Sequence, residues 1–210
     1  MKRVPSWRSA IGAASGILAI VVFLSATAAP PRPQVAQAPV DEVALELDPA
    51  QSTVHFAVDS TLHKVHGTFL LKSGEIHFAP GSGEASGGII VLATSGVSGN
   101  NRRDARMHRE ILETPIYPEV VFRPTQIEGK VARAGASDVK LHGVIALHGH
   151  EHDIVASVHA ELSGDHWKGI AKFDVPYVQW GIKDASTWLL KVKPVVDVEV
   201  EMAGPAKIVN

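Results

Sequence analysis

Short segments in which apolar and polar side chains alternate dominate the sequence after about residue 43, and they constrain the fold more than any other feature. In residues 154–162, IVASVHAEL, the apolar side chains Ile154, Ala156 and Val158 occupy every second position, which is the period of a half-buried strand. The same period occurs in 54–58, 139–147, 167–173 and 196–202, and Gly and Ser turns separate further short strands within 65–95. About eight strands with short connections predict an all-β antiparallel barrel or sandwich.

One segment is convincingly helical. In residues 100–113, NNRRDARMHREILE, Met107 and Ile111 lie four positions apart, as do His108 and Leu112, so each pair shares one face of a helix. Asn100 or Asn101 is suited to cap the first turn, and Thr114-Pro115 ends the helix. The sequence therefore predicts one α-helix, at about 100–113, inserted between strands.

The first part of the chain has the layout of an export signal. A basic start precedes an apolar run over 10–24, and the small residues Ala26 and Ala28 follow it in an A-x-A arrangement. This order is typical of a secretory signal peptide, with an uncleaved membrane anchor as the alternative. The predicted organisation is a signal peptide over 1–28, a proline-rich linker over 29–42, a barrel domain over 43–205 and a tail over 206–210.

Charge and composition exclude several classes of function. The 210 residues carry a formal net charge of −2, and without residues 1–28 the chain keeps 17 Lys and Arg against 22 Asp and Glu. A nucleic-acid partner is not expected, because such proteins present a clustered basic face. The chain has no cysteine, so it has neither a disulfide nor a catalytic thiol. We expect an exported protein, periplasmic or secreted, with no stable membrane span after signal cleavage.

Residues 148–153, HGHEHD, are the strongest candidate for catalytic chemistry. A strand would present His148, His150 and His152 on one face, as in a zinc site of a metal-dependent hydrolase. The flanking rows 139–147 and 154–162 favour a hairpin instead, joined by about six polar residues whose strand geometry is lost at the tip. We expect no metal site and no enzymatic activity here, and no serine-nucleophile or phosphate-loop motif occurs elsewhere in the sequence.

Five elements in order resemble the YceI-like family over about residues 45–204. They are LDPAQSTVHFAV, then VHGTFLLKSGEIHF, then NNRRDARMHREILETPIYPEVVFRPTQI with the family's Arg-Asp pair and YP-x-x-x-F pattern, then VKLHGVIALHGHEHDIVASV, and VPYVQWGIKD with an aromatic-Gly-Ile element. The resemblance implies an exported eight-stranded lipocalin-like barrel that binds a polyisoprenoid, an isoprenoid quinone or another long amphiphilic lipid. It implies a noncatalytic carrier without a cofactor.

In such a barrel the ligand would occupy the interior, against inward-facing apolar side chains. The predicted wall residues are Phe56, Val58, Phe69, Leu71, Ile90, Leu92, Phe122, Ile145, Val158, Phe173 and Trp188, and Met107, Ile111, Tyr177 and Trp180 are predicted to cover an opening. Arg103 and Asp104 either bind a head group or tie the helix to a loop. Two questions stay open from the sequence. The barrel could be filled, as in an exported structural or stress-related domain, and the chain could form a homodimer.

Overall fold

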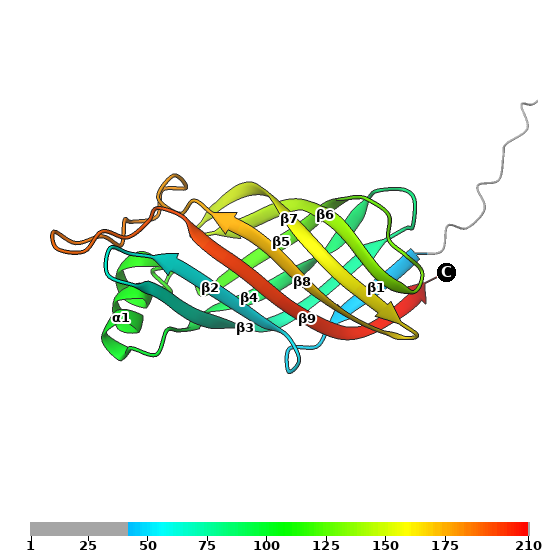
Figure 1. Ribbon diagram of the computed structural model, residues 1–210, viewed down its shortest axis with the longest axis horizontal. Helices are drawn as coiled ribbons and strands as arrows, with labels where there is room; N and C mark the ends of the chain where they lie inside the picture. The colour runs from blue at the N-terminus through cyan, green and yellow to red at the C-terminus, as the bar shows by residue number, and fades with distance from the viewer. Residues whose placement is uncertain (1–41, 210) are drawn as a thin grey trace, which may run out of the picture. The chain divides into compact units, whose positions relative to one another are not determined.

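The computed structural model of the protein describes residues 42–209 (Figure 1). The predicted signal peptide and nearly all of the predicted linker therefore lie outside the described residues. The strands are β1 Glu42–Leu47, β2 Thr53–Asp59, β3 Lys64–Phe78, β4 Ala85–Val97, β5 Glu119–Glu128, β6 Gly135–Leu147, β7 His150–Ser163, β8 His166–Val175 and β9 Val196–Val209. One helical segment, α1 Asn101–Arg106 followed by a π-helical turn over Met107–Ile111, lies between β4 and β5.

The nine strand segments form a closed antiparallel barrel with eight strand positions. Each of β3 to β9 pairs with its neighbours in the chain, and β1 and β2 together occupy the remaining position between β3 and β9. Closure leaves no exposed sheet edge among residues 42–209. The predicted all-β, eight-stranded lipocalin-like barrel with one inserted helix is confirmed.

The first strand position is interrupted by a tight turn between β1 and β2. The carboxylate of Asp48 accepts hydrogen bonds from the backbone N–H of Ala50 at 2.9 Å and from the side chain of Gln51 at 2.7 Å. The backbone N–H of Asp48 still donates to the carbonyl of Ala203 on β9. The turn therefore displaces the chain locally without opening the barrel.

The last strand continues further than the sequence analysis expected. Residues 206–209 pair in antiparallel register with β1, from Ala206 opposite Leu45 to Val209 opposite Glu42. The predicted domain end at residue 205 is therefore too early, and the predicted tail 206–210 is part of β9 as far as Val209. A proline such as Pro205 is typical of a strand end, whereas in the structure the pairing of 206–209 with β1 continues the strand beyond it.

The helical segment begins where the sequence indicated and ends slightly earlier. The side chain of Asn100 accepts hydrogen bonds from the backbone N–H groups of Arg102 and Arg103, both at 3.1 Å, so Asn100 is the N-cap. The last turn widens to the π form, with the N–H of Leu112 donating to the carbonyl of Met107. No helix in the described part of the chain is long and apolar enough to cross a membrane.

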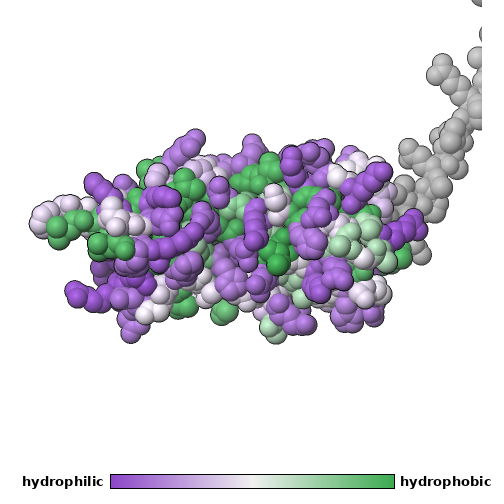
Figure 2. All heavy atoms as spheres, viewed as in Figure 1, coloured by the Kyte–Doolittle hydropathy of each residue, from purple (hydrophilic) through white to green (hydrophobic). Residues whose placement is uncertain are grey.

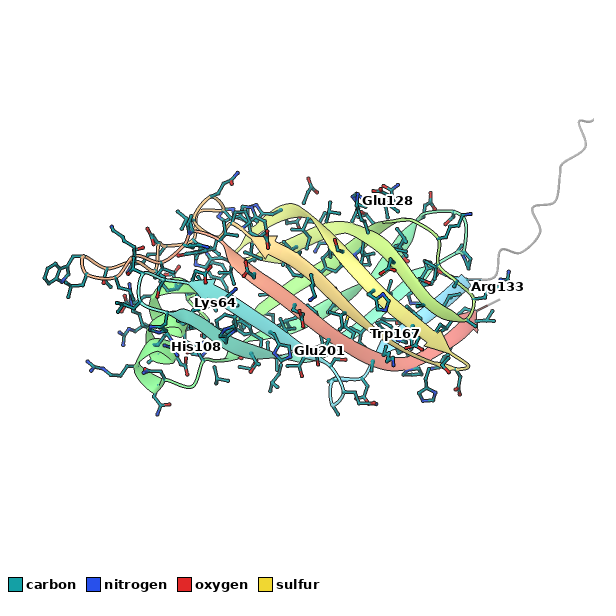
Figure 3. All side chains as sticks on the ribbon, in the orientation of Figure 1. Lys64, His108, Glu128, Arg133, Trp167 and Glu201 are labelled. Carbon is teal, nitrogen blue, oxygen red and sulfur yellow. The ribbon has the colours of Figure 1, made fainter. Side chains whose placement is uncertain are left out.

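The barrel interior is densely packed in the half remote from α1. The main buried cluster there includes Leu47, Leu71, Ile76, Phe78, Val158 and Trp167. Trp167 lies well away from His108 and the helix (Figure 3), and its indole N–H donates to the carbonyl of Glu46 at 2.9 Å. Trp167 can be buried at little cost because its indole N–H is hydrogen-bonded, and its large ring fills space in the interior. This half of the barrel is therefore filled by the protein's own side chains.

Candidate ligand-binding cavity

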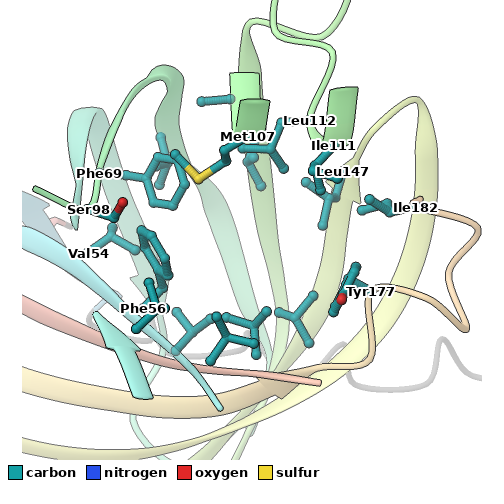
Figure 4. Close-up of a pocket in the computed structure, with 18 of the residues that line it drawn as sticks. Val54, Phe56, Phe69, Ser98, Met107, Ile111, Leu112, Leu147, Tyr177 and Ile182 are labelled. Carbon is teal, nitrogen blue, oxygen red and sulfur yellow. The ribbon is translucent and has the colours of Figure 1, made fainter. Parts of the chain in front are cut away.

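The other half of the barrel interior is hollow. A cavity of about 510 Å³ opens among the residues nearest α1 and the connection between β8 and β9 (Figure 4). Its floor is formed by residues that also belong to the packed cluster, among them Leu141, Ala156 and Met202. Its lining is almost entirely apolar, and its size falls in the range of small-molecule sites.

Most of the predicted ligand-binding residues line this one cavity. They are Phe56, Val58, Phe69, Met107, Ile111, Phe122, Ile145, Phe173 and Tyr177. Figure 4 shows Phe56 and Phe69 on one side of the cavity and Tyr177 on the other, with Met107 and Ile111 lying across the top. The rings of Phe56 and Phe69 are 5.2 Å apart. Their part in binding a ligand remains a prediction.

Ile90 and Leu92 do not line the cavity; their neighbours Ile89, Val91 and Ala93 do. The prediction chose the wrong face of β4, because residues 89–92 read Ile-Ile-Val-Leu and are apolar on both faces. Alternation therefore could not show which parity points inward. The register of β4 against β3 and β5 decides it.

Four other predicted residues lie elsewhere. Leu71 belongs to the packed half, and Val158 likewise contributes to that cluster rather than to the cavity lining. Trp180 is half-buried in a second cluster with Val175, Tyr177 and Ile182, beside the mouth. Trp188 is 88% exposed at the tip of the connection between β8 and β9, so the structure contradicts a wall position for it. Trp188 lies in a loop, where no alternation of apolar and polar residues indicates which side chains are exposed.

Arg103 and Asp104 meet at Ser98, at the end of β4. Arg103 Nε donates to the Ser98 hydroxyl at 2.7 Å and Nη2 donates to the Ser98 carbonyl at 2.7 Å. Asp104 accepts from the N–H and the hydroxyl of Ser98. Burial acts to raise the pKa of Asp104, but the bonds from Ser98 and the nearby Arg103 outweigh it and hold that pKa below its ordinary value. Both side chains tie the helix to the sheet, while only Arg103 also lines the cavity.

A second tie joins the helix to the connection between β8 and β9. Arg106 Nη1 donates to the carbonyl of Ala185 at 3.0 Å, and its Nε lies 3.6 Å from Glu110. The N–H of Ala185 donates to the Tyr177 hydroxyl at 3.3 Å. Burial raises the pKa of Tyr177, so its phenol stays neutral. Helix and loop therefore form one cover beside the mouth.

The histidine segment forms a tighter turn than the sequence analysis expected. Strands β6 and β7 are joined by two residues only, His148 and Gly149, both at positive φ as a type I′ turn requires. The expectation that strand geometry is lost over 150–153 was wrong, since these residues are in β7. His148 Nε2 lies 2.7 Å from Glu113, whereas His152 stacks on Trp180.

These side chains do not converge on one point. His148 also packs 4.4 Å from the ring of Tyr117, on the side of the turn facing the helix end. His150 is exposed, with its ring 6.5 Å from that of His152. Within residues 42–209 no group of three or more His, Asp or Glu side chains is placed to hold a metal ion.

Many apolar cavity residues were not among the predicted ligand-binding residues. They are Val54, Val65, Ile89, Val91, Ala93, Leu112, Val120, Leu141, Leu147, Ile154, Ala156, Ala171, Val175, Ile182, Ala185, Leu190, Val192, Val196, Val198, Val200 and Met202. The alternating rows already contained the signal for those in strands, whereas Ile182, Leu190 and Val192 lie in a connection where no periodicity applies.

The fold and its apolar chamber define an up-and-down β-barrel of the kind that encloses one small ligand. The family model for the YceI-like domain matches residues 45–203, so the chain belongs to the YceI-like family. No curated protein matches the sequence.

Solved structures share the fold at low sequence identity. BcnA from Burkholderia cenocepacia aligns with a TM-score of 0.61 and 13% identity, covering 75% of this chain and 99% of that one. A polyisoprenoid binding domain from Saccharophagus degradans, implicated in plant cell wall breakdown, aligns with a TM-score of 0.57 and 15% identity over 77% and 98% of the two chains. The YCEI protein of Campylobacter jejuni aligns with a TM-score of 0.54 and 19% identity over 68% and 85%.

Proposed function

We propose that this protein is a noncatalytic carrier that holds one long amphiphilic lipid, such as a polyisoprenoid or an isoprenoid quinone, inside the barrel. The observation that carries the proposal is the cavity of about 510 Å³ with its almost wholly apolar lining. Transfer of an apolar chain from water into this cavity would be favourable by about 25 cal/mol for each Å² of apolar surface buried. Few polar contacts are then needed for firm binding.

The polar groups near the mouth indicate how such a ligand would be oriented. Besides the phenol of Tyr177, the polar members of the lining are Ser60, His63, Ser98, Asn100, Arg103 and Arg106, against a floor of apolar side chains. A head group would therefore remain at the mouth, where these donors are, and the tail would point to the floor. The polyisoprenoid binding reported in the name of the Saccharophagus degradans domain supports this class of ligand.

We further propose that the protein is exported, to the periplasm or beyond the cell. The basic, apolar and small-residue order of 1–28 supports this. N-terminal sequencing of the protein from its native cells should find Ala29 as the first residue. An N-terminus at Met1 on the recovered protein would contradict cleavage.

Lipid extraction tests the carrier function. Protein purified without detergent and examined by native mass spectrometry should carry one lipid per chain, which organic solvent releases for identification. Recovery of ligand-free protein after expression in the native host, with no uptake of added prenyl quinone, would count against the proposal.

A pair of substitutions on β4 tests whether the lipid binds inside the cavity. Ala93 faces the cavity and is buried, whereas the next residue, Thr94, faces outward and is exposed. We expect Ala93→Trp to fill the hollow and lower lipid occupancy at least about tenfold, because the volume it takes is the volume that the tail needs. Thr94→Trp should leave occupancy unchanged. Equal occupancy in the two variants, both folded by circular dichroism, would place the ligand outside the cavity.

A further inference from the structure

Large apolar side chains project into solvent at the mouth end of the barrel, and three of them lie on two loops that are joined to each other. Trp188 is 88% exposed and Leu189 is 72% exposed, in the connection between β8 and β9, and Leu62 is 77% exposed in the connection between β2 and β3. We call these three residues the apolar tip. Figure 2 shows apolar side chains on the β8–β9 connection where it protrudes at the left end of the barrel.

Hydrogen bonds hold the apolar tip in a defined conformation. The N–H of Thr187 donates to the carbonyl of Leu190 at 2.8 Å, so Trp188 and Leu189 occupy the two central positions of a closed turn. The N–H of Thr61 donates to the carbonyl of Lys191 at 2.9 Å, which joins this loop to the one that carries Leu62. The hydrogen-bonded conformation of the two loops therefore keeps the three side chains exposed.

The two loops that carry the apolar tip also line the cavity. Leu190 and Val192 face inward from one loop, and Ser60 and His63 from the other, while Trp188 faces solvent. Ser60 and Val192 are joined by a β-bridge. A surface that accepted the apolar tip would therefore lie next to the opening of the cavity.

Charge is distributed unevenly between the mouth and the rest of the described barrel. The connecting segments at the mouth, 60–63, 98–118, 148–149 and 176–195, hold seven Lys or Arg against four Asp or Glu. The rest of residues 42–209 holds nine Lys or Arg against 17 Asp or Glu. A negatively charged surface would attract the connecting segments at the mouth and repel the rest of the described barrel.

We propose that the apolar tip docks the mouth of the barrel onto an anionic lipid bilayer. Tryptophan and leucine next to basic residues are the side chains that enter the interface between head groups and acyl chains. A second copy of the chain fits less well, since pairing through this tip would bring two net-positive ends together. The proposal goes beyond ligand binding and holds whatever the cavity contains.

The absence of native cysteine allows a site-specific test in the full chain. An environment-sensitive dye is attached to Leu189→Cys or, as the matched control, to Ile208→Cys at the opposite end, where the side chain is 70% exposed. With vesicles of phosphatidylcholine and phosphatidylglycerol, the dye at position 189 should shift to the blue and be quenched by bromine-labelled acyl chains. The dye at 208 should stay in water. Identical responses at the two positions would overturn the proposal.

A second variant tests the tryptophan itself. With the dye on Leu62→Cys, Trp188→Ala should raise the lipid concentration needed for half-maximal shift by about tenfold, since the largest inserting side chain is lost. Vesicles of phosphatidylcholine alone should bind more weakly than the anionic ones. An unchanged lipid requirement in Trp188→Ala would contradict docking through the tip. So would sedimentation showing that Trp188 instead joins two copies of the protein in the absence of lipid.

Discussion

The imidazole of His152 stacks on the indole of Trp180, with ring centroids 4.2 Å apart and planes 2° from parallel. His152 faces the interior side of β7, and its buried Nε2 has no hydrogen-bond partner among the described residues. Trp180 comes from the connection after β8. The stack therefore fastens that connection to the rim of the barrel, and it gives a histidine of the HGHEHD segment a packing role.

The two loop tryptophans should differ in their effect on stability. We expect Trp180→Ala to lower the free energy of unfolding by about 2 kcal/mol, less than the roughly 3–5 kcal/mol of a fully buried aromatic because Trp180 is half-buried. Trp188→Ala should change it by less than about 0.5 kcal/mol, as for other exposed residues. Urea unfolding followed by circular dichroism measures both. Equal losses would show that the stack contributes nothing.

The turn between β6 and β7 should tolerate asparagine better than a branched side chain. His148 is held at φ 53° and lies 2.7 Å from Glu113, which is itself at φ 45°. His148→Asn loses the contact with Glu113 but keeps a residue suited to this conformation, whereas His148→Val loses both. We expect the valine variant to be less stable than the asparagine variant by about 1–2 kcal/mol. Thermal unfolding of the two proteins side by side gives the difference.

Gly67 should be intolerant of any side chain. It lies opposite Phe56 in the register of β2 and β3, and a Cβ there would approach the Phe56 ring and the Val97 carbonyl to 2.3 Å. Because the carbonyl is backbone and cannot turn aside, we expect Gly67→Ala to cost about 2 kcal/mol and to displace Phe56 into the cavity.

Gly88→Ala on β4 is the matched control, since a Cβ there would meet only the Phe122 carbonyl, at an ordinary 3.7 Å. Its unfolding free energy should stay within about 1 kcal/mol of the parent protein, as glycine-to-alanine changes at compatible positions do. A Gly67→Ala protein with unaltered stability would show that the strands can separate at this point.

The hydrogen bonds that Asp104 accepts from Ser98 should make the stability of the fold depend on pH. The pKa of Asp104 in the folded protein is below the ordinary 3.8, so the carboxylate stabilises the fold at pH values above about 4. This contribution is lost as the pH falls through the folded-state pKa. Asp104→Asn should therefore be less stable than the parent protein at pH 7, and the difference should shrink towards pH 3. A difference that stays constant with pH would exclude the carboxylate as its source.

Much of the fold could be predicted from the residues themselves. The alternating rows of β6, β7 and β8 define buried and exposed faces, because each inward position must be apolar while its neighbour meets water. Asn100 marks the start of the helix for a local reason, since its side chain satisfies backbone N–H groups that the first turn leaves free. The family resemblance then favoured a barrel over the sandwich that alternation leaves open.

Other features depended on contacts between distant segments. Ile90 and Leu92 were assigned to the wrong face because both faces of β4 are apolar and only its pairing with β3 and β5 sets the register. The exposure of Trp188 follows from the turn that carries it, which no periodic pattern describes.

By itself, the sequence determined that this chain forms about eight strands with one apolar face each, because the period of two is a local property of the residues. Its resemblance to the YceI-like family indicated that those faces enclose the interior of a barrel. Only the tertiary structure decided where that interior is full and where it is hollow. The same kinds of side chain face inward along the whole barrel, but a buried cluster that includes Trp167 and Phe78 fills one half, whereas the half beneath α1 keeps a space of about 510 Å³. Whether opposing side chains meet depends on their distance across the closed barrel, which no single strand specifies.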